Sequence, residues 1–556
     1  MNTPLRFLLA LCITVLCGFS MAAATPSIAF VPLDNRPPCM DHVLRLAAIA
    51  GADLRVPPYK AIGAYSFSGN PDQVEHWLDT LEPAPDYLII SLDMLAYGGL
   101  VASRVPDTPE PEAIARLAAI EHFTAKNPRT QIFAFGIIQR IARTATGDPE
   151  YDGVTDLISK YLKLNDHAKA QNDAALAARA AEFKAKIPEQ QLADYLAART
   201  RNHAVNRAAV ALAASGVLDY LVLAMDDNAE YGPHRPEREV LSLAIQQAGA
   251  ADRVLIKPGA DEVGQLLLAR AVNHARRLLP RIALHFVPPQ AADWIAPLED
   301  RPLSAMAAAS LQAAGATVAT DKHIHGHLIV YAGDSPPHTP AGAEQQAADL
   351  AAKLSGRGRA AGVADVRFVN KSDAGLAALL LQNPGPAALS SYAGWNTAGN
   401  AFGTAAAHLL VAYTLRLDAA RGADVRARAA AHAAFLLQRF ADDYLYMAAI
   451  RPNLEMELRM RNASPVNIPA NIYGEFRGEL TDAVQNKTRA LFRDYFHDAL
   501  LNLGTSTPAL HVQDMSLNTL MPWFRLFEID ADVRVNLKPT GIYGPTIPAR
   551  VRVLDP

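Results

Sequence analysis

The chain has 556 residues, with 52 Lys and Arg against 56 Asp and Glu, and half of its residues are hydrophobic. This near balance of charge argues against a nucleic-acid partner, and no apolar run after the first residues is long enough to cross a bilayer. We therefore expect a globular protein without stable membrane insertion, large enough for about two to four domains.

The first 24 residues have the order of a signal peptide. An apolar stretch at 7–19 is followed by Ala22-Ala23-Ala24, which supplies the small residues of a cleavage site. The pattern predicts cleavage after Ala24 and export to the periplasm or the medium. Cys12 and Cys17 would leave with this leader, so Cys39 would remain alone and could form no internal disulfide.

From residue 27 to about 395, short apolar runs alternate with longer Ala- and Leu-rich stretches. This alternation predicts an α/β fold with a parallel sheet covered by helices on both faces, either TIM-barrel-like or doubly wound. A strand count of about eight slightly favours the barrel. The predicted strands are Ile28–Val31, Leu54–Val56, Tyr87–Leu92, Gln131–Phe135, Tyr220–Ala224, Val254–Ile256, Ala283–Val287, Leu328–Tyr331, Val366–Val369 and Ala388–Tyr392.

Shifts in composition divide the mature chain into three predicted regions. Residues 25–403 form the α/β domain expected to be catalytic, with a helical insertion at about 156–215. Residues 404–505 are rich in helix formers and predict a helical region, and residues 506–556 predict a small C-terminal β element.

Polar residues follow the predicted strands. In parallel α/β folds, binding sites form in the loops at the carboxyl ends of the strands, so these residues are the candidates for a site. Taken in chain order, they are Asp34, Arg36, Asp93, Tyr97, Arg104, Arg140, Asp226, Asp227, Asp261, Glu262, Trp395, Asn396 and Asn400, and Asn202 in the helical insertion joins them.

Several of these residues stand in longer motifs. They are Pro-Leu-Asp-x-Arg-Pro at 32–37, Asp-Met-Leu-x-Tyr-Gly-Gly-Leu at 93–100 with Ser103-Arg104, Arg201-Asn202, Asp226-Asp227, Gly-Ala-Asp-Glu at 259–262, and Ala-Gly-Trp-Asn-Thr-Ala-Gly-Asn at 393–400. In these motifs, the chain resembles a family of secreted and cell-envelope proteins that is grouped as domain of unknown function 4127. The resemblance spans most of the mature chain but implies no activity, so function has to be inferred from the chemistry of the site.

The adjacent carboxylates Asp226 and Asp227 are the predicted catalytic pair. In one pocket, two neighbouring carboxylates raise the pKa of one of them, which yields an acid beside a base. The pair is similar to the aspartates of retaining hexosaminidases, where one orients the substrate acetamide and the other protonates the leaving oxygen. Asp261 and Glu262 supply a second acidic pair in support. The alternative is that these residues cap helices or favour their dipoles.

The remaining candidates are predicted to bind substrate. Trp395 beside Asn396 is typical of a sugar site, since the indole stacks on a ring and the amide binds hydroxyls. The other residues in this group are Asp34, Arg36, Asp93, Tyr97, Arg104, Arg140, Asn202 and Asn400. For the arginines, the alternative role is to pair with the loop aspartates.

We therefore expect a glycoside hydrolase, or another carbohydrate-active hydrolase, that acts on a saccharide or small molecule without cofactor or metal. One alternative is a metal-dependent hydrolase, indicated by His323, His325 and His327 in alternation. Another is a carbohydrate-binding protein without catalysis. No motif indicates the oligomeric state.

Overall fold

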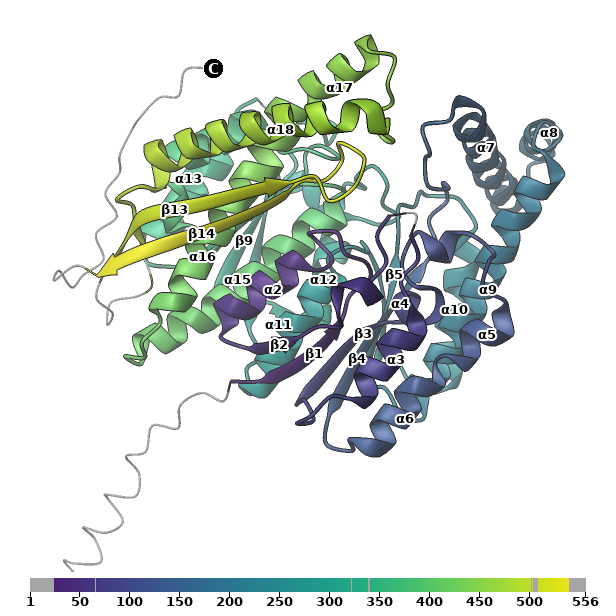
Figure 1. The fold of residues 1–556 in the computed structure, drawn as a ribbon, viewed down its shortest axis with the longest axis horizontal. Helices are drawn as coiled ribbons and strands as arrows, with labels where there is room; N and C mark the ends of the chain where they lie inside the picture. Colours follow the sequence, from purple (N-terminus) through teal and green to yellow (C-terminus); the bar gives the residue numbers. More distant parts are fainter. Residues whose placement is uncertain are drawn as a thin grey trace, which may run out of the picture.

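The computed structural model describes residues 25–539, apart from 66, 322, 339–340, 502 and 504–508. The predicted signal peptide at 1–24 and the last residues of the predicted C-terminal element, 540–556, lie outside the described residues. Strands and helices alternate through the α/β part of the chain, and a helical region and an antiparallel sheet follow (Figure 1). The predicted fold class is therefore confirmed.

The parallel strands form two open sheets instead of a barrel, so the slight preference for a barrel was wrong. The first sheet has the order β2-β1-β3-β4-β5-β6, and the second has the order β11-β10-β9-β7-β8. The first consists of β1 (Ser27–Val31), β2 (Asp53–Arg55), β3 (Tyr87–Ser91), β4 (Gln131–Ile138), β5 (Tyr220–Met225) and β6 (Val254–Pro258). The second consists of β7 (Arg281–Val287), β8 (Thr317–Val318), β9 (Gly326–Tyr331), β10 (Ala361–Asp365) and β11 (Ser391–Ala393).

The predicted strand at 366–369 was also wrong, because the strand is β10, five residues earlier. Its sequence Ala-Gly-Val-Ala-Asp looks weakly apolar, but every one of its residues is buried. A Cβ at Gly362 would meet the Ser391 hydroxyl at 2.1 Å, so close packing against β11 requires small side chains here. The bulkier residues 366–369 form an irregular loop.

Helices cover both faces of the sheets. They are α2 (Asp41–Ala50), α3 (Pro71–Asp79), α4 (Leu92–Tyr97), α5 (Glu110–Ala115), α6 (Ala118–Lys126), α7 (Pro149–Gln171), α8 (Ala174–Lys184), α9 (Glu189–Ala214), α10 (His234–Gln247), α11 (Val263–Ala275), α12 (Leu303–Ala313), α13 (Ala343–Gly356), α14 (Ala374–Gln382), α15 (Ala398–Ala420), α16 (Arg426–Arg439), α17 (Arg451–Met460) and α18 (Ala470–Leu491). None of the helices in the described part of the chain is long and apolar enough to cross a membrane.

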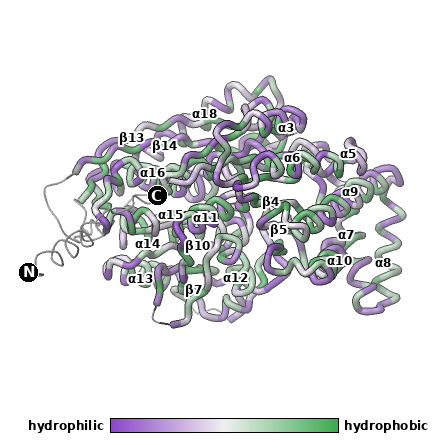
Figure 2. The backbone as a smooth tube through the Cα atoms, turned by 90° about the horizontal axis from the view of Figure 1, so that it is seen from below, coloured by the Kyte–Doolittle hydropathy of each residue, from purple (hydrophilic) through white to green (hydrophobic). Residues whose placement is uncertain are grey.

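One hydrophobic core joins the two sheets. Phe30 of β1 and Ile329 of β9 belong to the same cluster as Leu266 of α11 and Leu409 of α15. The next residue of β1, Val31, points to the opposite face, into a second cluster with α3, α4 and α6. Figure 1 accordingly shows α2, α11 and α15 between the sheets, and Figure 2 shows that strands such as β5 are apolar. Fully buried strands are what parallel sheets covered on both faces require.

The C-terminal sheet is antiparallel, with the order β12-β13-β14. It consists of β12 (Leu500–Leu501), β13 (Leu510–Leu520) and β14 (Asp530–Pro539). The β13–β14 hairpin lies against α16 (Figure 1). Its connecting loop, residues 521–529, reaches back to the α/β part of the chain and contributes to the cavity described next.

Candidate functional site

A cavity of about 220 Å³ lies where the carboxyl ends of strands from both sheets meet. Its polar lining comes from the segments that follow β1, β3, β4, β5 and β6 of the first sheet, from the loops after β10 and β11 of the second, and from the β13–β14 loop. The polar residues are Arg36, Arg104, Arg140, Thr144, Asp226, Asp227, Asp261, Asn370, Asn396 and Arg525. Leu298, Trp523 and Phe527 contribute apolar surface. Seven of the residues predicted from strand ends therefore share one cavity.

Arg36 joins two carboxylates on one wall. Its guanidinium donates to Asp34 at 2.8 Å and binds both oxygens of Asp261, at 2.7 and 3.1 Å. The Asn396 amide donates to the same carboxylate at 3.1 Å. Burial raises the pKa of Asp261, while Arg36 opposes this shift by favouring the ionised form. The bonds hold the carboxylate in a single orientation towards the cavity.

Asp226 and Asp227 are each paired with an arginine, but unequally. Arg104 donates to Asp226 at 2.5 Å, whereas Arg140 reaches Asp227 at 3.2 Å. Asp227 keeps 28% of its side chain exposed, against 11% for Asp226. Asp226 also accepts the backbone N–H of Asp227 at 3.0 Å. Asp227 is thus the more accessible and less firmly bound of the two.

The two pKa values are displaced in opposite directions. Burial raises the pKa of Asp226, but Arg104 and Arg140 outweigh it and hold the value below the usual range. Burial, and then the charge of Asp226, raises the pKa of Asp227 to about 6. Near neutral pH the site therefore contains an ionised carboxylate beside one that exchanges its proton readily.

Three loop residues around the cavity adopt left-handed backbone conformations. These are Leu298, Asn370 and Asn396, with φ of 66°, 65° and 55°. Asn tolerates this region, but a leucine there is unusual and strained. The Asn370 N–H donates to the Asn396 carbonyl at 2.9 Å, and the Leu298 carbonyl accepts from Asn228 N–H at 3.1 Å. Such strain is often found at ligand-binding sites.

The loop between β13 and β14 supplies cavity residues that were not predicted from the sequence. The Arg525 guanidinium lies 4.6 Å from the centre of the Trp523 ring and 5.3 Å from that of Phe527, and it is held by Glu528. The local signal was the run Met-Pro-Trp-Phe-Arg-Leu-Phe at 521–527, which places three aromatic residues and an arginine in one turn.

The sequence profile described as "Protein of unknown function (DUF4127)" matches residues 28–532. The chain belongs to the DUF4127 family. The resemblance seen in the motifs at 32–37 and 393–400 is thereby confirmed. No curated protein and no solved structure matches this DUF4127 chain.

Glu262 and Trp395, two predicted site residues of the DUF4127 chain, do not line the cavity. Glu262 is fully buried and paired with Lys257, which is also fully buried. Trp395 is buried, donates to the Thr404 hydroxyl at 3.2 Å and packs edge-on against His42. Both side chains are buried under the loops after β6 and β11 and contribute to the packing of these loops.

Four further predicted residues do not line the cavity either, but bind or pack against the segments around it. Asp93 accepts the Ile137 N–H at 2.9 Å, and burial raises its pKa to about 7. The Tyr97 ring lies under a guanidinium, and the Asn202 amide donates to the Ser103 carbonyl at 2.8 Å. The Asn400 side chain accepts the backbone N–H of Asp261 at 3.1 Å, so it fixes the loop that carries this carboxylate.

The three alternating histidines lie away from the cavity. His327 is in β9, where its ring pairs with His285 at 3.0 Å, and His325 accepts the Arg281 N–H at 3.0 Å. Across the described residues, no group of three or more His, Cys, Asp and Glu side chains is arranged to hold a metal ion.

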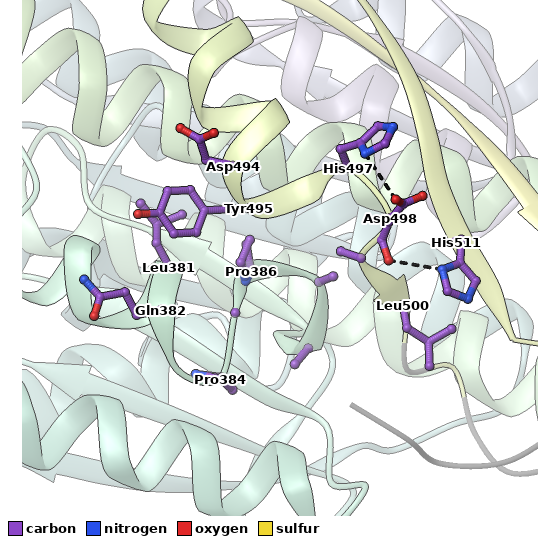
Figure 3. Close-up of a pocket in the computed structure, with 14 residues that line it drawn as sticks. Leu381, Gln382, Pro384, Pro386, Asp494, Tyr495, His497, Asp498, Leu500 and His511 are labelled. Atoms are coloured by element: carbon purple, nitrogen blue, oxygen red, sulfur yellow. Dashed lines mark hydrogen bonds and ion pairs between the residues drawn. The ribbon is translucent and has the colours of Figure 1, made fainter. Parts of the chain in front are cut away.

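A separate hollow of about 260 Å³ lies at the amino end of β11, beside the segment 384–388. Figure 3 shows His497 and His511 on either side of Asp498, and all three residues line the hollow. His497 is 3.4 Å from the Asp498 carboxylate, and His511 contacts its carbonyl at 3.1 Å. None of the predicted site residues lines this hollow.

Proposed function

We propose that this protein is an exported glycoside hydrolase in which Asp227 is the general acid and Asp261 is its partner carboxylate. The observation that carries the proposal is the opposite displacement of the Asp226 and Asp227 pKa values inside one cavity. Glycosidases typically use two carboxyl groups with different pKa values, one as acid and the other as base or nucleophile.

Asp227 fits the role of acid because its carboxyl is exposed to the cavity and has a pKa near 6. A group with that pKa can hold a proton near neutrality and release it in the transition state. In the proposed reaction Asp227 protonates the glycosidic oxygen as the bond to the anomeric carbon breaks. Asp226, fixed by Arg104, stays ionised and keeps the Asp227 pKa high.

Asp261 fits the role of partner because it follows β6, whereas Asp227 follows β5, and both line the same cavity. Neighbouring residues such as Asp226 and Asp227 share a backbone and cannot readily act from opposite sides of a bond. In the reaction Asp261 either attacks the anomeric carbon or removes a proton from the attacking water. A carboxylate separation of about 5–5.5 Å suits the first route, and about 6.5–9.5 Å the second.

The rest of the lining supports a polar ring-shaped substrate. The amides of Asn370 and Asn396 and the guanidinium of Arg140 offer donors for hydroxyls, and Trp523 and Phe527 offer apolar faces. This mixture of aromatic surface and a few polar groups is usual in pockets for small polar ligands.

The experiment is a screen of purified protein against aryl glycosides and cell-envelope polysaccharides, followed by the variant Asp227→Asn. We expect the variant to keep its fold, seen by circular dichroism, and to lose about 10²–10⁴ in rate. The matched control is Asp252→Asn, an exposed carboxylate outside the cavity, which should keep wild-type activity. A folded Asp227→Asn with wild-type turnover would refute the assignment. Saccharide binding without turnover by the wild type would favour the non-catalytic alternative.

A further inference from the structure

An apolar groove of about 450 Å³ adjoins the candidate active-site cavity. The two share part of their walls, namely Val101, Arg104, Thr144, Ala145 and Trp523. A molecule bound beside Asp226 could therefore extend past Arg104 into the groove without leaving the protein surface.

Aromatic side chains form much of the groove. The rings of Tyr65 and Trp523 lie 5.0 Å apart, and Arg525 lies 5.1 Å from the centre of the Tyr65 ring. Phe67 and Phe524 are exposed at the groove, with 73% and 47% of their surface accessible. Exposed aromatic residues gathered in one concavity are typical of a binding surface.

Two polar side chains of the groove, Arg143 and Thr144, are hydrogen-bonded within the protein. Arg143 donates to Thr155, to Gln191 and to the Tyr151 carbonyl, at 2.9–3.0 Å. The Thr144 hydroxyl accepts from Arg104 at 2.9 Å. An incoming hydroxyl group would compete with these bonds, whereas an apolar group would only displace water from the aromatic walls.

We propose that the groove binds an apolar aglycone, so that the substrates are glycoconjugates with a sugar beside Asp227 and an aryl or alkyl group beyond Arg104. This inference rests on the proposed function for the identity of the sugar half. The polar and apolar halves of such a substrate match the two connected halves of the site.

The test uses 2-naphthol, a fluorescent aryl alcohol without a glycosidic bond, titrated into the purified protein. We expect saturable binding of one molecule per chain. Phe67→Ser and Val105→Asp, both in the groove, should each weaken binding about tenfold or more, because they remove apolar contact or add a charge. The control is Val240→Asp on α10, whose valine is 46% exposed, against 39% for Val105, and which should bind as the wild type does. Thermal unfolding of each variant shows that it is folded.

Absence of saturable binding to the wild type, or equal binding by all variants, would overturn the inference. Because 2-naphthol contains no sugar, its binding does not depend on hydrolysis. Failure of the proposed function would instead appear as absence of glycoside turnover while naphthol binding persists. On a sugar that is hydrolysed, the naphthyl glycoside should have a KM about tenfold or more below that of the methyl glycoside. Equal KM values would also contradict the inference.

Discussion

The indole N–H of Trp523 donates a hydrogen bond of 2.9 Å to the side-chain oxygen of Asn35, 488 residues earlier in the chain. Asn35 follows β1, and Trp523 is in the β13–β14 loop, so the bond ties that loop to the loop after the first strand. The Asn35 amide in turn donates to the Tyr59 hydroxyl at 2.5 Å. Through these contacts the C-terminal loop becomes a wall of both the cavity and the groove.

We expect Trp523→Phe to destabilise the protein by about 1–3 kcal/mol, because the buried Asn35 oxygen loses this donor. Urea unfolding measures the change. Trp77→Phe, at a half-buried position in α3, is the control for loss of an indole elsewhere. Equal stability of Trp523→Phe and the wild type would mean that the bond does not anchor the loop.

On a hydrolysed glycoside, kcat/KM should fall as the pH rises through about 6, because Asp227 then loses the proton that a general acid must hold. Arg140 lowers the Asp227 pKa, so Arg140→Gln should move this decline to higher pH. Rate measurements from pH 4 to 9 test both points. A decline at the same pH in the two proteins would argue against Asp227 as the titrating group.

Acid should destabilise the fold through His432. Burial lowers the pKa of His432 to about 4, below the value of about 6.5 for an unfolded chain. The unfolded chain therefore binds the proton first, and stability is lost as the pH falls from about 6.5 to 4. The loss is on the order of 3 kcal/mol. His432→Gln should lose less stability than the wild type between pH 7.5 and 4.5 in urea unfolding. An identical loss in both would exclude His432 as a source.

The buried pair of Lys257 and Glu262 should make Gly403 intolerant of any side chain. A Cβ at Gly403 would meet Cγ of Glu262 at 2.2 Å, so Gly403→Ala should cost about 1–3 kcal/mol. Gly474→Ala in α18 is the matched control, because nothing lies within 4 Å of its Cβ, and it should be neutral or stabilising. Thermal denaturation compares them. A stable Gly403→Ala would mean that Glu262 can move.

The local pattern of apolar runs and of polar residues after them was sufficient to predict the fold class and part of the site. Runs such as Tyr87–Ser91 are apolar throughout because both faces of a parallel sheet are covered. The carboxyl ends of such strands share one edge, which is why Arg36, Asp227 and Asp261 could be expected to meet from their positions after three different strands.

Only the tertiary structure decided the rest. Whether the strands close into a barrel depends on which distant strands pair, and β6 and β7 belong to different sheets although they follow each other in the chain. Side-chain direction after a strand is likewise not periodic: Asp261 faces the cavity, whereas its neighbour Glu262 turns to buried Lys257. Trp523 lines the site although it lies 488 residues after Asn35 in the chain, because long-range packing brings their two loops together. Such a contact cannot be predicted from local periodicity or composition.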